Sequence, residues 1–228
     1  MSQANRQGGS CAKKKILIVD DHPLVRQGIR TLLAESDDLE VCGEAENAAG
    51  ALEAMAKVEP DAAIVDLTLK ESSGLELIKD IRIRHPDVVV LVLSMRDEGF
   101  YAERVLRAGA RGYITKAEGP RKVLDGIRKV LAGQVYISEK MASKVMSKIV
   151  EGASNEVCSP VAGLTDRELT VLEMIGTGLP TREVAAKLHI SPKTVDSYRE
   201  HIKDKLKLDN ATELLKYAVQ WVQGQKNL

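Results

Sequence analysis

Residues 62–67 read Ala62-Ala63-Ile64-Val65-Asp66-Leu67, a short apolar run that ends in a carboxylate. Such a run, with β-branched members and polar residues on both sides, is typical of a buried strand in a parallel sheet. Ligands and reactive groups collect at the carboxyl ends of these strands. A lone Asp in this place also caps turns, so the role of Asp66 depends on the partners that the rest of the chain brings to it.

The composition is that of an ordinary folded protein. The chain has 228 residues, 44% apolar and 29% charged, which suits one large domain or two small ones and excludes disorder throughout. The 33 acidic and 33 basic side chains cancel, so any attraction to nucleic acid must be local. Aromatic residues make up only 3%, which argues against stacking platforms for single strands.

The N-terminus and the cysteines indicate a cytoplasmic protein. Residues 1–12 lack the apolar core of a signal peptide, and we expect a flexible tail there. No stretch approaches the roughly 18 apolar residues of a membrane span. Cys11, Cys42 and Cys158 match no metal or redox spacing and are expected to be reduced, unpaired thiols.

Over residues 13–133, apolar runs alternate five times with segments of helical spacing. The alternation predicts an α/β domain, a doubly wound (βα)5 sheet of the flavodoxin-like kind with right-handed crossovers. The predicted strands cover residues 16–19, 39–43, 62–66, 88–93 and 112–115.

The remainder of the chain is helical. Residues 134–161 form a predicted linker with one short helix, of which Met141, Val145 and Ile149 line one side. Residues 162–228 form a second, smaller all-α domain, where Thr165 and Glu168 have the spacing of a capping box. Four helices are expected there, over residues 165–176, 181–189, 192–207 and 211–223.

Polar groups follow four of the five predicted strands. Asp20 and Asp21 come after the first strand and Asp66 after the third, while Ser94 and Lys116 follow the fourth and fifth. These strand ends meet at one edge, where carboxylates repel and a hard divalent cation relieves the repulsion. An ammonium and a hydroxyl beside them could bind phosphoryl oxygens. Singly, each group also has an ordinary interpretation as a loop cap, a turn residue or a solvated charge.

The first part of the chain resembles the receiver domain of two-component response regulators. The resemblance rests on Leu17-Ile18-Val19-Asp20-Asp21-His22, Ile64-Val65-Asp66-Leu67, Ser73-Gly74, Leu93-Ser94 and Gly112-Tyr113-Ile114-Thr115-Lys116. It implies that Asp66 accepts a phosphoryl group from a histidine kinase in a transfer assisted by Mg²⁺.

The same resemblance implies a role for each neighbouring group. Asp21, Asp66 and the backbone carbonyl of Thr68 would hold the metal, with Asp20 acting directly or through water. Lys116 would pair with the phosphoryl group, Ser94 would donate a hydrogen bond to it, and Tyr113 matches the switch aromatic of the family. Tyr113 also has the simpler interpretation of an aromatic packed on the sheet edge.

Three positions qualify the match. Lys70 stands where proline is frequent, so the loop after Asp66 is expected to be more mobile. Ser94 replaces the commoner threonine and keeps the hydroxyl. His22 is expected to be a loop histidine at a helix start, with no chemical role.

The second part resembles the LuxR-type helix-turn-helix module, and the two parts together resemble a NarL/FixJ-type response regulator. The motifs are Leu164-Thr165-Asp166-Arg167-Glu168, Gly178, Glu183-Val184-Ala185, Leu188-His189-Ile190-Ser191, Thr194-Val195 and Lys205-Leu206. The resemblance implies that residues 192–207 enter the major groove of double-stranded DNA. The candidate DNA contacts are Lys193, Thr194, Asp196, Ser197, Arg199, Glu200, Lys203 and Lys187.

The charge of this module is nearly balanced, with ten Lys and Arg against nine Asp and Glu over residues 161–228. Phosphate contacts dominate affinity for DNA, so they must be made locally. Asp196 and Glu200 could accept from a cytosine amino group or weaken binding until a dimer doubles the contacts. The last helix is expected either to serve the core or to pair two copies.

We therefore expect a cytoplasmic transcriptional regulator that is phosphorylated on Asp66 and binds an inverted-repeat operator as a dimer. It would catalyse its own phosphotransfer and slow dephosphorylation without being a turnover enzyme. Two alternatives stay open: an aspartate-nucleophile phosphatase, and a receiver that signals through protein contacts with a module that no longer binds DNA.

Overall fold

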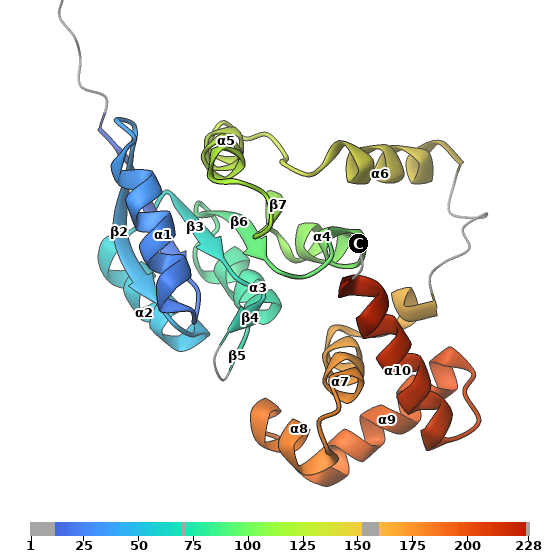
Figure 1. The fold of residues 1–228 in the computed structure, drawn as a ribbon. Helices are drawn as coiled ribbons and strands as arrows, with labels where there is room; N and C mark the ends of the chain where they lie inside the picture. The colour runs from blue at the N-terminus through green and yellow to red at the C-terminus, as the bar shows by residue number, and fades with distance from the viewer. Residues whose placement is uncertain (1–11, 70–71, 152–159, 227–228) are drawn as a thin grey trace, which may run out of the picture.

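The computed structural model describes residues 12–69, 72–151 and 160–226. Two parts are visible in Figure 1, a sheet with helices on both faces and a group of helices that lies against its α4 side. Among the described helices, none is long and apolar enough to cross a membrane. Residues 1–11 of the predicted tail, residues 152–159 of the predicted linker, Lys70, Cys11 and Cys158 lie outside the described residues.

The sheet has five parallel strands in the order β2-β1-β3-β6-β7. This order and the alternation of strands with helices confirm the predicted doubly wound α/β domain. The strands are β1 (Lys14–Val19), β2 (Leu39–Ala45), β3 (Ala62–Val65), β6 (Val89–Ser94) and β7 (Gly112–Thr115).

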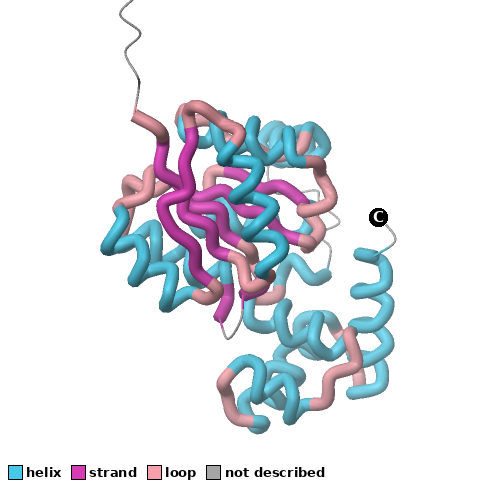
Figure 2. Tube along the Cα trace, turned by 60° about the vertical axis from the view of Figure 1, so that its left-hand side comes forward, coloured by secondary structure: helices cyan, strands magenta, loops and turns pink. Residues whose placement is uncertain are grey.

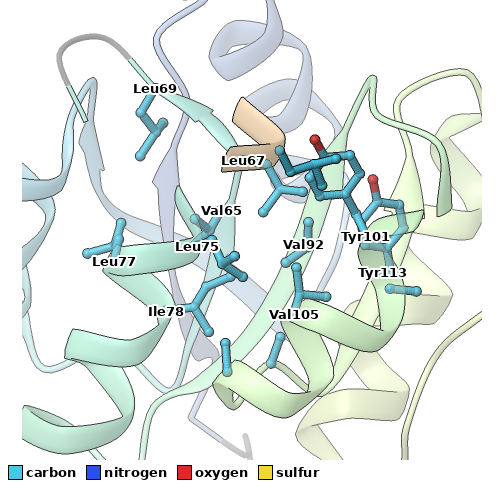
Figure 3. Packing of buried hydrophobic residues seen from close by; sticks show 14 of the residues in the cluster. Val65, Leu67, Leu69, Leu75, Leu77, Ile78, Val92, Tyr101, Val105 and Tyr113 are labelled. Carbon is cyan, nitrogen blue, oxygen red and sulfur yellow. The ribbon is translucent and has the colours of Figure 1, made fainter. Parts of the chain in front are cut away.

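Helices cover both faces of the sheet, as Figure 2 shows. Strand β1 illustrates the reason, because successive side chains point to opposite faces: Leu17 and Val19 pack in one apolar cluster, Ile16 and Ile18 in another. The first cluster lies under α2 (Ala48–Val58), α3 (Gly74–Arg84) and α4 (Glu98–Ala108), and the second under α1 (Pro23–Ala34) and α5 (Pro120–Leu131). Figure 3 shows part of the first cluster.

A short hairpin follows Asp66, where the sequence indicates only a turn. Strands β4 (Thr68–Leu69) and β5 (Ser72–Ser73) pair antiparallel. The hairpin is anchored because Leu69 is buried and Ser72 Oγ accepts a hydrogen bond of 3.0 Å from the N–H of Ala48, at the start of α2. Two-residue strands leave no periodic pattern, which explains why the sequence did not reveal them.

The predicted linker begins as an extension of the sheet. Tyr136 forms a parallel bridge with Gly112, and its carbonyl accepts a bond of 2.8 Å from the Tyr113 N–H. The expected short helix follows as α6 (Glu139–Glu151), with Met141 buried and Val145 packed against the core. The side chain of Ile149 lies outside the described part of the structure.

The described residues of the second part form the four predicted helices and, before them, a 3-10 turn that was not predicted. The capping box of Thr165 and Glu168 is confirmed, as is the cap at Ser191, whose side chain accepts from the Thr194 N–H. Gly176 is required by packing, because a Cβ there would lie 2.3 Å from the Ala218 carbonyl oxygen. The elements are η1 (Pro160–Gly163), α7 (Asp166–Gly176), α8 (Thr181–Leu188), α9 (Pro192–Leu206) and α10 (Ala211–Lys226).

Candidate functional site

The polar groups at the strand ends meet at one edge of the sheet because the strands are in register there. Val19 pairs with Val65, and the N–H of Asp66 donates to the Val19 carbonyl over 2.9 Å. This register sets the carboxylates of Asp20 and Asp66 side by side. Asp20 is 2% exposed and Asp66 is 3% exposed. Two buried carboxylates that lie side by side repel each other and need a counter-charge.

Lys116 supplies that counter-charge. Its Nζ lies 2.6 Å from Asp20 Oδ2 and 2.6 Å from Asp66 Oδ2. Burial lowers the pKa of Lys116, but the hydrogen bonds to Asp20 and Asp66 outweigh burial, so the pKa lies above its usual value. The ammonium is therefore charged at neutral pH and bridges the two carboxylates.

The acidic groups also suit a divalent cation. Ligand atoms from Asp20, Asp21, His22 and Asp66 all lie within 4.8 Å of one another. One oxygen, Asp21 Oδ1, is buried within this group and faces the ring nitrogen of His22. A hard cation with oxygen ligands such as Mg²⁺ fits this set. The carbonyl of Thr68 is a further predicted ligand. Thr68 lies beside these acidic groups, since the Thr68 N–H donates to Asp66 Oδ1 over 3.2 Å.

His22 lies beside the acidic groups. It is the N-cap residue of α1, as expected for a histidine at a helix start. Its Nδ1, however, lies 2.8 Å from Asp21 Oδ1 and 3.2 Å from Asp20 Oδ1. The ring thus contacts both carboxylates while remaining largely exposed.

Gly74 holds the start of α3 against the backbone of Asp66. The Gly74 N–H donates to the Leu67 carbonyl over 3.1 Å. A Cβ at this position would lie 2.0 Å from the carbonyl oxygen of Asp66 and 2.7 Å from Leu67 Cα. Only glycine permits this approach, which is why Ser73-Gly74 belongs to the signature.

The side chains of Ser94 and Tyr113 both form hydrogen bonds with the backbone of Arg96. Ser94 Oγ accepts a long hydrogen bond of 3.4 Å from the Arg96 N–H, and the Tyr113 hydroxyl donates over 2.8 Å to the Arg96 carbonyl. Tyr113 is only 1% exposed, and burial raises the pKa of its hydroxyl. Figure 3 labels Tyr101 and Tyr113 at the same edge of the apolar cluster. The candidate switch aromatic is therefore packed inward.

Arg96 itself was not identified from the sequence. Its guanidinium lies 3.3 Å from the hydroxyl of Thr68 and 3.3 Å from that of Tyr101, and pairs with the carboxylate of Glu173 in α7. A single arginine in a loop has no periodicity that could have revealed these contacts.

In the helical part, most of the candidate DNA contacts lie on the outside of α8 and α9. The face of α9 that meets the core carries Val195 and Ile202, which are buried. The candidates Lys187, Lys193, Thr194, Asp196, Ser197 and Glu200 are exposed.

Two further candidates, Arg199 and Lys203, should be exposed if they contact DNA, but they are half-buried. Arg199 turns back toward α8, where its guanidinium donates to Thr181 Oγ1 over 3.3 Å. Lys203 pairs with Glu200 at 2.8 Å. Both cations already have partners on the protein.

Comparison with known proteins agrees with the two-part organisation. Residues 16–128 match the family described as "Response regulator receiver domain", and residues 162–218 match "Bacterial regulatory proteins, luxR family". The chain is 37% identical over 205 residues to the response regulator GacA of Pseudomonas syringae pv. syringae, covering 90% of this chain and 95% of that protein.

Other relatives have the same arrangement. The oxygen regulatory protein NreC of Staphylococcus carnosus is 36% identical over 209 residues, with 90% and 96% of the two chains covered. A structure of RcsB from Salmonella enterica serovar Typhimurium, bound to promoter P1flhDC with the phosphomimetic BeF3−, is 27% identical with a TM-score of 0.66, covering 90% of this chain and 98% of that one.

A receiver domain followed by a LuxR-type helix-turn-helix domain defines a class of signalling proteins, the transcriptional response regulators of two-component systems. The chain belongs to the NarL/FixJ-type family within that class.

Proposed function

We propose that the chain is a phosphorylation-controlled, sequence-specific DNA-binding regulator whose phosphoacceptor is Asp66. The observation that carries the proposal is the ammonium of Lys116 between Asp66 and Asp20, beside the carboxylate of Asp21. A buried carboxylate flanked by an ammonium and by further acids suits transfer of a phosphoryl group.

In the proposed reaction, an oxygen of the Asp66 carboxylate attacks phosphorus of a phosphohistidine on a sensor histidine kinase. The P–N bond breaks, the imidazole leaves, and an acyl phosphate forms on Asp66. Lys116 and the Ser94 hydroxyl would hold the phosphoryl oxygens. Asp21, Asp66, Asp20 and the Thr68 carbonyl would hold Mg²⁺, which when bound neutralises charge on the transferred group.

The adjacent Asp20 and Asp21 at the end of β1 argue against the phosphatase alternative. Such phosphatases usually place the nucleophile after the first strand, with a second Asp two residues later. Here the acid flanked by ammonium follows β3. We therefore propose self-phosphotransfer and slow autodephosphorylation without turnover of an external substrate.

For the second domain, we propose that α9 enters the major groove of an inverted-repeat operator and that two phosphorylated copies bind as a dimer. The exposed residues Lys193, Thr194, Asp196 and Ser197 on α9 would face the DNA, with Lys187 of α8 at the backbone. Since a bacterial regulator that binds DNA works where the DNA is, we propose that the protein acts in the cytoplasm.

The phosphorylation site is tested with Mg²⁺ and a small phosphodonor. Intact-mass measurement should reveal one added, acid-labile phosphoryl group that Asp66→Asn lacks. Asp61→Asn is a matched control, because Asp61 precedes β3 and pairs with Lys14 at 2.6 Å away from the site; it should be labelled like the wild type. Labelling of Asp66→Asn, or none of the wild type, would refute the proposal.

DNA binding is tested by selection from a random duplex pool with the phosphorylated protein. An inverted repeat should be enriched, and Arg199→Ala should bind it poorly, in part because Arg199 also joins α9 to α8. Absence of enrichment would favour the alternative in which the helical domain makes only protein contacts.

A further inference from the structure

The guanidinium of Arg26 lies between the carboxyl ends of two neighbouring strands. Helix α1 packs beside β2 (Figure 1), and from α1 the Arg26 side chain reaches the ends of β1 and β2. Its Nη1 donates to the Asp20 carbonyl over 2.7 Å, and its Nε and Nη2 donate to Glu44 and Glu46 over 3.1 Å each. The side chain is 12% exposed. Because all three nitrogens have acceptors, the planar guanidinium is held in one place.

The backbone of Asp20 is fixed by hydrogen bonds on both of its polar groups. Its N–H donates over 3.1 Å to the carbonyl of Ala45, the last residue of β2, and its carbonyl accepts from Arg26. That carbonyl belongs to the peptide that joins Asp20 to Asp21, so its direction sets how both residues leave the sheet. Their carboxylates are among the groups whose ligand atoms lie within 4.8 Å of one another. A turn of this one peptide would therefore displace two candidate metal ligands.

The charge of Arg26 is compensated by its partners. A cation close to an acidic site weakens the binding of a divalent metal ion by repulsion. Glu44 and Glu46 both pair with Arg26, and Glu44 also pairs with Arg30. The two arginines and two glutamates together carry no net charge. Arg26 can therefore hold the Asp20 carbonyl with little effect on the attraction of the site for a metal ion.

Resting on the proposed function, we infer that Arg26 is a positioning residue for the proposed metal site, through its hydrogen bond to the Asp20 carbonyl. It orients the peptide between Asp20 and Asp21, so that the two carboxylates can hold one divalent cation together. Outer partners of metal ligands commonly act in this way, and their loss lowers metal affinity by about tenfold or more.

The effect of Arg26 should be confined to the metal. Within the described residues, the polar partners of its side chain are Asp20, Glu44 and Glu46. Neither the proposed phosphoacceptor Asp66 nor Lys116 is among them. Once a metal ion is bound, transfer of the phosphoryl group should therefore proceed without Arg26.

Arg30, one turn further along α1, is the matched contrast. Its guanidinium also binds Glu44, with Nε at 2.7 Å, and in the described part of the chain Glu44 is its one side-chain partner. Arg30 thus shares the charge network of Arg26 without holding Asp20. Replacing either arginine by glutamine removes one cation, which on electrostatic grounds should tighten the binding of a divalent cation. Weaker binding can follow only from lost positioning.

The first measurement uses Mn²⁺ as the probe, because Mn²⁺ takes the same oxygen ligands as Mg²⁺ and its EPR signal reports the free ion. The full-length wild type, Arg26→Gln and Arg30→Gln are titrated without phosphodonor, with Mg²⁺ as competitor. Arg26→Gln should bind Mn²⁺ about tenfold more weakly than the wild type, although it lacks a nearby cation. Arg30→Gln should bind Mn²⁺ at least as tightly as the wild type.

The second measurement separates positioning from general stability. Labelling of Asp66 by a small phosphodonor is followed over a range of Mg²⁺ concentrations. In Arg26→Gln the half-saturating Mg²⁺ concentration should rise about tenfold, while the labelling rate at saturating Mg²⁺ should approach that of the wild type. Urea unfolding without metal gives the change in stability. A purely structural role would lower stability and leave the half-saturating concentration where it was.

Arg26→Lys retains the charge and serves as a second variant in case Arg26→Gln does not fold. Its single ammonium cannot hold three separate acceptors, so it should also bind Mn²⁺ more weakly than the wild type, whereas a charge effect alone would leave the affinity unchanged. Unchanged or tighter Mn²⁺ binding by the folded Arg26 variants, or an equal weakening in Arg30→Gln, overturns the role of Arg26. A wild type that takes up neither Mn²⁺ nor a phosphoryl group would instead refute the proposed phosphorylation site, on which this role rests.

Discussion

Phe100 and Trp221, the only phenylalanine and the only tryptophan of the chain, pack against each other across the two domains. Their rings meet edge-to-face at an interplanar angle of 67°. Edge-to-face aromatic pairs contribute about 1 kcal/mol beyond the area they bury. Because there is no second tryptophan, fluorescence reports on this one contact.

Replacing Phe100 should loosen docking. Phe100→Ala removes the ring that covers Trp221, so the emission should move to longer wavelength before any ligand is added. Emission spectra of the folded protein measure this, and Leu24→Ala is the control because Leu24 is 87% exposed on α1. Identical spectra for the wild type and Phe100→Ala would contradict the observed contact.

Replacing Gly74 should directly damage the proposed phosphorylation site. A Cβ in Gly74→Ala would stand 2.0 Å from the Asp66 carbonyl oxygen, and overpacking against backbone should cost at least about 3 kcal/mol. Denaturant unfolding and phosphodonor labelling should both show the loss. Gly28→Ala is the matched control, because Gly28 lies in α1 with nothing within 4 Å and should gain up to about 1 kcal/mol.

Removing the ammonium of Lys116 should leave the carboxylates without a counter-charge. We expect Lys116→Met to destabilise the metal-free protein by about 3 kcal/mol and to abolish labelling of Asp66. Added Mg²⁺ should raise the Tm of this variant more than that of the wild type, because the cation replaces the missing charge. Lys122→Met removes an exposed pair with Glu118 and should change neither property.

Glu168 should make the helical domain sensitive to acid. Burial raises the pKa of Glu168, but hydrogen bonds from Lys205 and Thr165 lower it more, so the folded pKa lies below 4.5. Its contribution to stability is therefore present above pH 4.5 and is lost as the pH falls through the folded value. The substitution Glu168→Gln preserves the capping box and removes the negative charge.

The corresponding measurement is urea unfolding of Glu168→Gln followed by Trp221 emission. The variant should be about 1 kcal/mol less stable than the wild type near pH 7, and the difference should shrink below pH 4.5. The Nδ1 of His201 lies 3.9 Å from Glu168. The variant His201→Ala tests whether His201 contributes to the difference in stability. A difference that is constant with pH would argue against the Lys205 pair as the cause.

Lys193 should contribute a phosphate contact in the DNA complex. Its charge is exposed at the start of α9, so Lys193→Ala should weaken binding to all sequences alike and reduce the salt slope of log K by about one. Binding titrations over a range of salt concentrations measure both effects. Lys216→Ala on α10, also exposed, should leave the slope unchanged if α10 does not touch DNA.

The meeting of polar groups at one edge of the sheet was predictable because these residues stand at the ends of apolar runs, which reveal both the strands and their common edge. Asp66, Asp20 and Lys116 lie together there, as this pattern indicates. The β4–β5 hairpin and the bridge of Tyr136 were missed, because each involves too few residues to form a period.

The docking surface was missed for a different reason. In the sequence, Asp166 and Glu173 look like solvated positions of an amphipathic helix, and Arg96 like an ordinary loop cation. Their partners lie in the other domain, and no local pattern reveals a contact between distant parts of a chain. The apolar surface of α10 left open a role in the core and a dimer contact. Part of that surface, the ring of Trp221, packs on Phe100 of the receiver domain.

Lys116 and Asp20 directly follow β7 and β1, the last and the first strands of the sheet in chain order. A partly synthesised chain that ends before β7 therefore lacks the ammonium that lies beside Asp66 in the complete domain. On the role proposed for Asp66, such a chain should not be labelled by a phosphodonor until the last strand is in place.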